Sequence, residues 1–133
     1  MTAVASVNPT GDPYVDGVLT GVKWGVTSLT YSFPTSGSYY EYTGEAGNNF
    51  NAFTTVQQNA VREVLQNYAS VANVTFTEIT ETSTQHADLR YAGSDAPSTA
   101  WAYYPSTSAQ GGDRKSTRLN SSHAITSRMP SSA

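Results

Sequence analysis

The sequence predicts an α+β domain in which one long amphipathic helix packs on a twisted, mostly parallel β-sheet. Residues 55–72 have the apolar spacing of a helix, and residues 28–33 and 74–79 on either side alternate like strands. A strand, a helix and a second strand form a unit whose two strands normally run parallel. No internal repeat or linker interrupts residues 1–113, which are enough for one domain with one core.

The segments around the first strand are expected to be irregular. Residues 7–24 read as turns and short extended pieces, because Asn-Pro, Gly-Asp-Pro and Asp-Gly sequences reverse the chain there. Asp12 and Asp16 lack the spacing of a calcium-binding loop, so we expect them to hold turns and helix caps. Pro34 ends the strand at 28–33, and residues 35–53 follow as a surface loop rich in Tyr, Gly and Asn.

The helix has the clearest signal in the chain. Thr54 and Gln57 form a Thr-x-x-Gln capping box at its start. One continuous apolar stripe follows at helical spacing, made of Val61, Val64, Leu65, Tyr68, Ala69 and Ala72. Glu63 lies on the opposite face, so we interpret it as a solvated charge rather than a catalytic acid.

The remaining sequence predicts more strands and then a foreign tail. Strands are expected at residues 74–79, 87–92 and 100–104, and a Gly-Gly-Asp turn follows at 111–113. Residues 114–133 contain six serines, no aromatic residue and no helical or strand period. We therefore predict a disordered tail there, whose opening resembles translated adapter sequence and indicates a non-native origin. The domain is expected to span residues 1–113.

Composition excludes several classes of function. Residues 1–113 carry three basic and ten acidic side chains, a net charge of −7, so no basic stripe is available for nucleic acid. The absence of cysteine excludes disulfides and thiolate zinc sites. No apolar run is long enough to span a membrane, and the first residues lack the pattern of a signal peptide.

The order of short motifs along the chain resembles one enzyme family. The motifs are Gly11 to Trp24, Leu29 to Pro34, Gln57 to Arg62, Val74 to Ile79, Ala87 to Tyr91, Ala100 to Pro105 and Gly111 to Asp113. Together they resemble the N-terminal part of the serralysin-like catalytic domain, which belongs to the metzincins, a group of zinc endopeptidases. The resemblance implies a metzincin-like N-terminal subdomain with an antiparallel edge strand that pairs with a bound peptide. It also implies an extracellular, secreted protein with peptide or protein substrates.

The resemblance places one candidate site on the last predicted strand. By position, Trp101, Ala102 and Tyr103 would line the upper rim of a substrate cleft. The same residues can equally be plain core and edge residues with no role in binding.

A resemblance to the related matrixin branch implies a second candidate site, for structural calcium. Asp88 and Asp113 would supply the carboxylates, with carbonyl oxygens near Ala109 and Gly111 as partners. The alternative is that Asp88 pairs with Arg90 along the same strand and that Asp113 caps a turn.

The zinc chemistry of the family is missing from the chain. That chemistry needs a His-Glu-x-x-His-x-x-Gly-x-x-His helix, in which three histidines bind zinc and the glutamate takes a proton from zinc-bound water. The sequence holds only His86 and His123, so we predict no zinc ligands and no catalytic residue. His86 reads as an exposed loop residue, and no Gly-x-Ser-x-Gly motif supports a serine hydrolase.

The sequence therefore predicts an inactive fragment of a secreted zinc-dependent endopeptidase. One alternative is a small secreted adhesion or carbohydrate-binding module that uses Tyr39, Tyr40 and Tyr42, although such tyrosines also serve as loop anchors. Another is a pseudo-protease fold kept for protein interaction.

Overall fold

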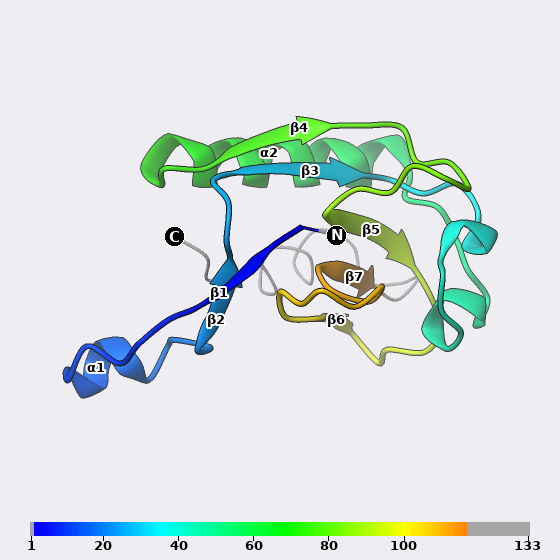
Figure 1. The fold of residues 1–133 in the computed structure, drawn as a ribbon. Helices are drawn as coiled ribbons and strands as arrows, with labels where there is room; N and C mark the ends of the chain where they lie inside the picture. The colour runs from blue at the N-terminus through cyan, green and yellow to red at the C-terminus, as the bar shows by residue number, and fades with distance from the viewer. Residues whose placement is uncertain (1, 117–133) are drawn as a thin grey trace.

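The computed structural model describes residues 2–116 and has a five-stranded main sheet (Figure 1). The strands lie in the order β4-β3-β5-β7-β6. Their bounds are β3 Ser28–Ser32, β4 Thr75–Glu78, β5 Leu89–Gly93, β6 Ala100–Ala102 and β7 Asp113–Ser116. Four strands run parallel, and β6 pairs antiparallel with β7 at one edge. The predicted α+β class, with a mostly parallel sheet, is confirmed.

The long helix α2, Thr55–Val71, begins and is capped as its sequence predicts. The Thr54 backbone N–H donates to Gln57 Oε1 at 2.8 Å, and the Gln57 N–H donates to Thr54 Oγ1 at 3.3 Å. Figure 1 shows α2 behind β3 and β4, covering one face of the sheet. Val61 and Leu65 on its apolar stripe are buried, which stabilises the fold by about 2 to 3 kcal/mol for each side chain. Glu63 is exposed, as expected.

The main apolar core lies between α2 and the sheet. Its buried members are Trp24, Leu29, Tyr31, Phe53, Val61, Leu65, Leu89 and Tyr91. Phe33 packs against this core, with its ring centroid 6.1 Å from that of Tyr91. A second, smaller cluster holds Tyr40, Ala46 and Ala92, and it is joined by Tyr42 and Phe50 from the loop after β3. The short helices η1, Gly37–Tyr39, and η2, Glu45–Gly47, lie in that loop.

One predicted strand begins later in the structure because side chains take the place of ladder hydrogen bonds at its start. The strand expected at 87–92 begins at Leu89. The Ala87 N–H donates to Glu81 Oε2, and the Asp88 N–H donates to Thr30 Oγ1. Neither backbone donor is then left for the neighbouring strand.

Residues 2–24 form an N-terminal arm that extends from the body of the protein (Figure 1). Strands β1, Val4–Ser6, and β2, Val22–Trp24, pair antiparallel, and the single-turn helix α1, Pro13–Asp16, lies between them. Asp12 caps α1, and Asp16 accepts hydrogen bonds from the N–H and hydroxyl of Thr10. These hydrogen bonds lower the pKa of Asp16. Both aspartates therefore hold the turn and cap positions that the sequence predicts.

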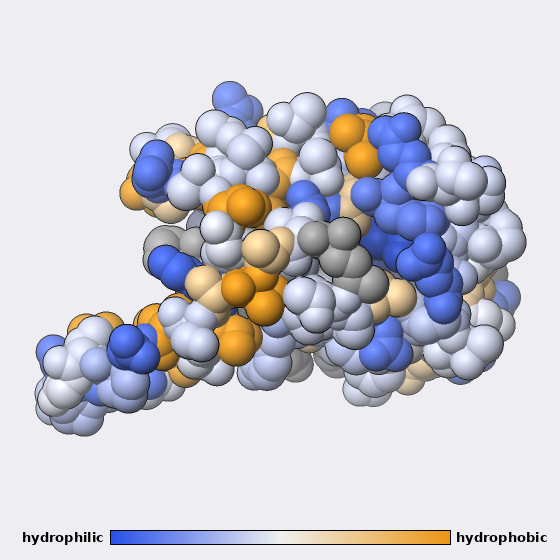
Figure 2. Space-filling view, in the orientation of Figure 1, coloured by the Kyte–Doolittle hydropathy of each residue, from blue (hydrophilic) through white to orange (hydrophobic). Residues whose placement is uncertain are grey.

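Apolar side chains are exposed along this arm, where Figure 2 shows hydrophobic residues at the surface. Val18 is 70% exposed and Val15 is 42% exposed. Val4 on β1 is 37% exposed.

The structure continues as a strand past Asp113, where the sequence predicts the end of the domain and a disordered tail. Arg114, Lys115 and Ser116 continue β7 between β5 and β6 and are buried. Two neighbouring strands supply backbone hydrogen bonds to this segment, and a backbone ladder forms whatever the side chains are. Composition alone therefore did not indicate this part of β7. The remaining predicted tail, with His123, lies outside the described residues.

Candidate functional site

The edge strand β6 is the first candidate site, because no strand of residues 2–116 pairs with its outer side. The Tyr103 N–H donates to Asp113 O at 2.9 Å, and the register pairs Trp101 with Lys115. Hydrogen-bonded and non-hydrogen-bonded pairs alternate in an antiparallel ladder. The N–H and C=O groups of Ala100 and Ala102 therefore point away from β7, toward the free edge.

The three predicted rim residues lie in different environments. Trp101 is 37% exposed, and Ala102 is half-buried beside the free edge. Tyr103 follows the strand, and its ring packs edge-on against Tyr42 at a centroid distance of 6.4 Å. Trp101 and Ala102 thus lie at the outer edge of the sheet, whereas Tyr103 is engaged in packing.

The first predicted calcium ligand, Asp88, is occupied by protein donors. It lies directly before β5, and its Oδ2 accepts from the Thr30 N–H at 2.8 Å and from the Thr30 hydroxyl at 3.0 Å. The Thr2 hydroxyl donates to Oδ1. Asp88 therefore joins the N-terminal arm to β3 and β5, and it does not pair with Arg90.

The second predicted calcium ligand, Asp113, is fully buried at the start of β7. Its Oδ2 lies 2.6 Å from Lys115 Nζ, and its Oδ1 accepts from the Arg114 N–H. Burial raises the pKa of Asp113 to about 6. Among residues 2–116, no group of three or more His, Cys, Asp or Glu side chains could hold a metal ion. The calcium site stays a prediction.

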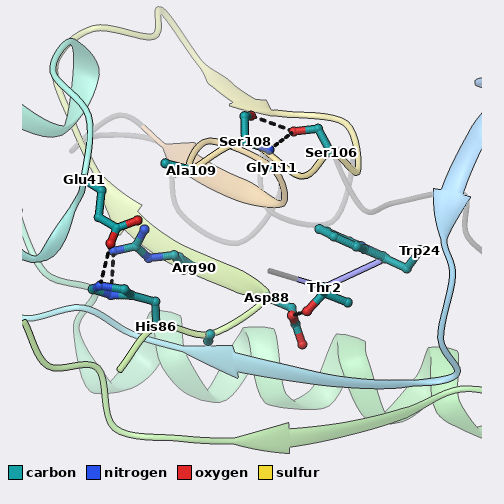
Figure 3. Close-up of a pocket in the computed structure, with 11 residues that line it drawn as sticks. Thr2, Trp24, Glu41, His86, Asp88, Arg90, Ser106, Ser108, Ala109 and Gly111 are labelled. Carbon is teal, nitrogen blue, oxygen red and sulfur yellow. Dashed lines mark hydrogen bonds and ion pairs between the residues drawn. The ribbon is translucent and has the colours of Figure 1, made fainter. Parts of the chain in front are cut away.

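A polar pocket of about 490 Å³ opens beside the start of β5 (Figure 3). Glu41, His86 and Arg90 lie together at one end, and Trp24, Thr2 and Asp88 lie at the other. The loop from Ser106 to Gly111 borders the pocket.

A buried carboxylate organises the first end of this pocket. The side chain of Glu81 is 1% exposed, and its Oε1 lies 2.7 Å from Arg90 Nε and 2.8 Å from His86 Nδ1. The Arg90 Nε–H does not point at that oxygen, so the contact is an ion pair without good hydrogen-bond alignment. Glu81 Oε2 accepts from the Ser32 hydroxyl at 2.6 Å. One buried carboxylate is therefore surrounded by four polar groups from β3, β5 and the preceding loop: the Arg90 guanidinium, the His86 ring, the Ser32 hydroxyl and the Ala87 N–H.

Arg90 connects this carboxylate to the tyrosine-rich loop. Its Nη2 donates to Tyr39 O at 2.8 Å, and its Cζ lies 4.1 Å from the centre of the Tyr40 ring. Tyr40 is buried, and Tyr42 packs edge-on against it at a centroid distance of 5.7 Å. Of the three tyrosines proposed to stack on sugars, Tyr40 and Tyr42 pack against each other, and Tyr39 accepts a hydrogen bond through its carbonyl oxygen.

His86 differs from the exposed loop residue that the sequence suggests, because its side chain is only 20% exposed. Its Nδ1 faces Glu81, and its Nε2 lies 3.6 Å from Glu41 Oε1. Its polar contacts among the described residues are with Glu41, Glu81 and Arg90, and none is with a serine. The arrangement lacks the hydroxyl nucleophile of a serine hydrolase. Sequence reasoning missed the cluster because Glu81 and His86 lie in a polar segment without periodicity.

Within residues 2–116, no helix is both long enough and apolar enough to cross a membrane. In comparisons with known proteins, no family model and no curated protein matches this chain.

Proposed function

We propose that this chain is the substrate-edge part of a serralysin-like zinc endopeptidase domain, and that β6 binds an extended peptide by strand addition. The observation that carries the proposal is the outer edge of β6, where the backbone groups of Ala100 and Ala102 have no neighbouring strand among residues 2–116. An edge of this kind pairs with an extended peptide through main-chain hydrogen bonds. The exposed ring of Trp101 supplies a contact for peptide side chains.

The sheet topology also supports this proposal. The family resemblance implies a mostly parallel sheet that ends in an antiparallel strand, and the order β4-β3-β5-β7-β6 has that form. The helix between β3 and β4 corresponds to the first long helix of the resemblance. An extracellular location and protein substrates belong to the same proposal.

The residues of this chain do not fit a catalytic zinc ion. The sequence contains no His-Glu-x-x-His motif, and His123 lies outside the described residues. Two histidines cannot supply the three that the family uses. We therefore assign peptide binding to this chain and no hydrolytic step.

The inactivity is tested with the purified 133-residue chain. We expect no hydrolysis of casein and no zinc after dialysis, measured by peptide release and by metal analysis. Proteolysis that is sensitive to a chelator would contradict this expectation.

Strand addition is tested with Ala102→Pro. Proline removes the outward N–H of residue 102 and leaves the hydrogen bonds between β6 and β7, so the fold should be retained. A blocked Ala-Val hexapeptide should bind the unaltered chain, and the variant should bind it about tenfold more weakly or worse. Binding is measured by chemical-shift titration. Equal binding by both proteins would show that the peptide does not add to β6.

A further inference from the structure

The position occupied by β7 is enclosed on both faces of the sheet, as is that of β5. The strand lies between β5 and β6, and its residues Asp113, Arg114, Lys115 and Ser116 are 0%, 5%, 1% and 1% exposed. Strands buried on both faces of a parallel sheet are normally continuous runs of apolar residues. Three consecutive charged residues fill this one.

On the helix-facing side, Arg114 occupies an apolar environment. Its Cζ lies 5.8 Å from the centre of the Tyr91 ring, and Tyr91 belongs to the main core. Its Nη1 donates to Gly112 O, but its buried Nε has no hydrogen-bond partner among the described residues. Burial lowers the pKa of Arg114, because the charged form is poorly solvated there. An aliphatic side chain would fill this space without leaving a buried donor unsatisfied.

On the opposite side, Lys115 lies against the second cluster. Its Nζ is 4.0 Å from the centre of the Tyr40 ring and 2.6 Å from Asp113 Oδ2. This ion pair lies within one strand. If β7 leaves the sheet as a unit, Asp113 and Lys115 leave together, so breaking up this ion pair is not required and no residue of β5 or β6 loses an ion-pair partner with it.

The remaining sheet offers backbone contacts that any strand can use. The Ser94 N–H donates to Ser116 O at 3.0 Å, and the Tyr103 N–H donates to Asp113 O at 2.9 Å. In both hydrogen bonds the acceptor is a main-chain oxygen of β7, so neither depends on the side chains of that strand.

We propose that the position between β5 and β6 is an acceptor site for an extended apolar peptide segment, which binds there in place of residues 113–116. Insertion of a strand into a sheet is an established mode of peptide recognition. The proposal does not rest on the peptidase proposal, since the outer edge of β6 takes no part in it.

The walls of the position define the side chains of the partner. The peptide residue that takes the place of Arg114, the second of the four, needs a long aliphatic side chain beside Tyr91. The third, in place of Lys115, needs an unbranched apolar side chain beside Tyr40. The fourth must be small, because Ser116 lies between Gly93 and Ala100 in the register. The first should be polar and uncharged, since Asp113 would lose its lysine partner.

The probe is the labelled peptide acetyl-Gln-Gly-Gly-Asn-Leu-Met-Ser-amide, and the matched control is acetyl-Gln-Gly-Gly-Asp-Arg-Lys-Ser-amide, which has the chain's own residues. Fluorescence anisotropy with the full 133-residue chain should show that the probe binds at least about tenfold more tightly than the control. Absence of probe binding, or equal binding of both peptides, would overturn the proposal.

Two variants locate the bound probe. The triple variant Asp113→Asn, Arg114→Leu and Lys115→Met carries the preferred strand in the chain itself, so probe binding should fall by at least about tenfold. Unchanged binding would place the probe elsewhere and refute the acceptor site. Ala102→Pro should keep probe binding, because only the outer edge of β6 is blocked. Loss of probe binding in Ala102→Pro would show that the probe binds at the outer edge of β6 and would reject insertion between β5 and β6. The test of strand addition with the Ala-Val hexapeptide can fail while this proposal still holds.

Discussion

The core beneath α2 and the strand β7 are both buried, but their side chains are of opposite kinds. Beneath α2, aliphatic side chains such as Val61, Leu65 and Leu89 pack in one cluster and carry no polar group themselves. In β7, Asp113 and Lys115 are buried as an ion pair, and Arg114 is buried with one donor unsatisfied.

The comparison separates two ways in which a segment becomes buried. Apolar residues gain free energy by leaving water, so the core stabilises the fold. Buried charges must first lose their hydration, and the attraction within the pair roughly offsets that cost at best. β7 is therefore held mainly by its backbone hydrogen bonds with β5 and β6, and it depends on the sheet that the core stabilises.

The largest effect is expected when one member of the buried pair is removed. Lys115→Met leaves the Asp113 carboxylate buried without its cation, which should lower the free energy of unfolding by about 3 to 5 kcal/mol. Adding Asp113→Asn should restore it to the original value or above. Urea unfolding measures both, with Lys23→Met as the control because Lys23 is exposed. A harmless Lys115→Met would show that β7 is not buried as described.

Truncation in the apolar core should have the next largest effect. Leu65→Ala removes a fully buried side chain and leaves a cavity, at a cost of about 2 to 5 kcal/mol. Val71→Ala on the same helix is the control, because Val71 is 85% exposed and should change stability little. Similar losses in the two variants would contradict the assigned helix face.

The pH dependence of the free energy of unfolding tests the burial of Asp113 without a substitution in β7. The raised pKa of Asp113, about 6 in the folded state, means that the folded state binds its proton more tightly than the unfolded state does. Its contribution to stability is complete below about pH 4 and is lost as the pH rises through about 6, a change of about 2 to 3 kcal/mol.

The control for this profile is the double variant Asp113→Asn with Lys115→Met, which retains all other carboxylates. Subtracting the pH profile of this variant from that of the unaltered chain should isolate the loss of stability that the deprotonation of Asp113 causes. A difference profile that is flat between pH 4 and 6 would rule out a buried Asp113.

The smallest effect is expected at the cap of α2. Thr54→Ala removes the side-chain acceptor of the Gln57 N–H and should cost about 1 kcal/mol. Thr55→Ala, one residue later, removes no capping bond and serves as the control. Thermal unfolding followed by circular dichroism should distinguish the two variants, and equal melting temperatures would argue against the capping box.

Local patterns predicted most of the fold correctly because their physical causes are local. The Thr54 to Gln57 box and the stripe through Val61 and Leu65 each depend on residues within a few positions. Local turn signals likewise predict that Asp12 and Asp16 hold cap and turn positions. The cluster of Glu81, His86 and Arg90 was not foreseen, because its geometry depends on loops that fold against β3 and β5.

By itself, the sequence determined the fold class, the long helix and its N-terminal cap, the approximate positions of β3, β4, β5 and β6, and the absence of the zinc motif, but it did not indicate β1 and β2 as strands. These follow from periodicity, turn chemistry and residue identity. Only the tertiary structure decided that Arg114, Lys115 and Ser116 form a buried strand, because two neighbouring strands supply the backbone partners. The tertiary structure also decided that Asp88 and Asp113 engage protein donors, since those donors come together only after the sheet has formed.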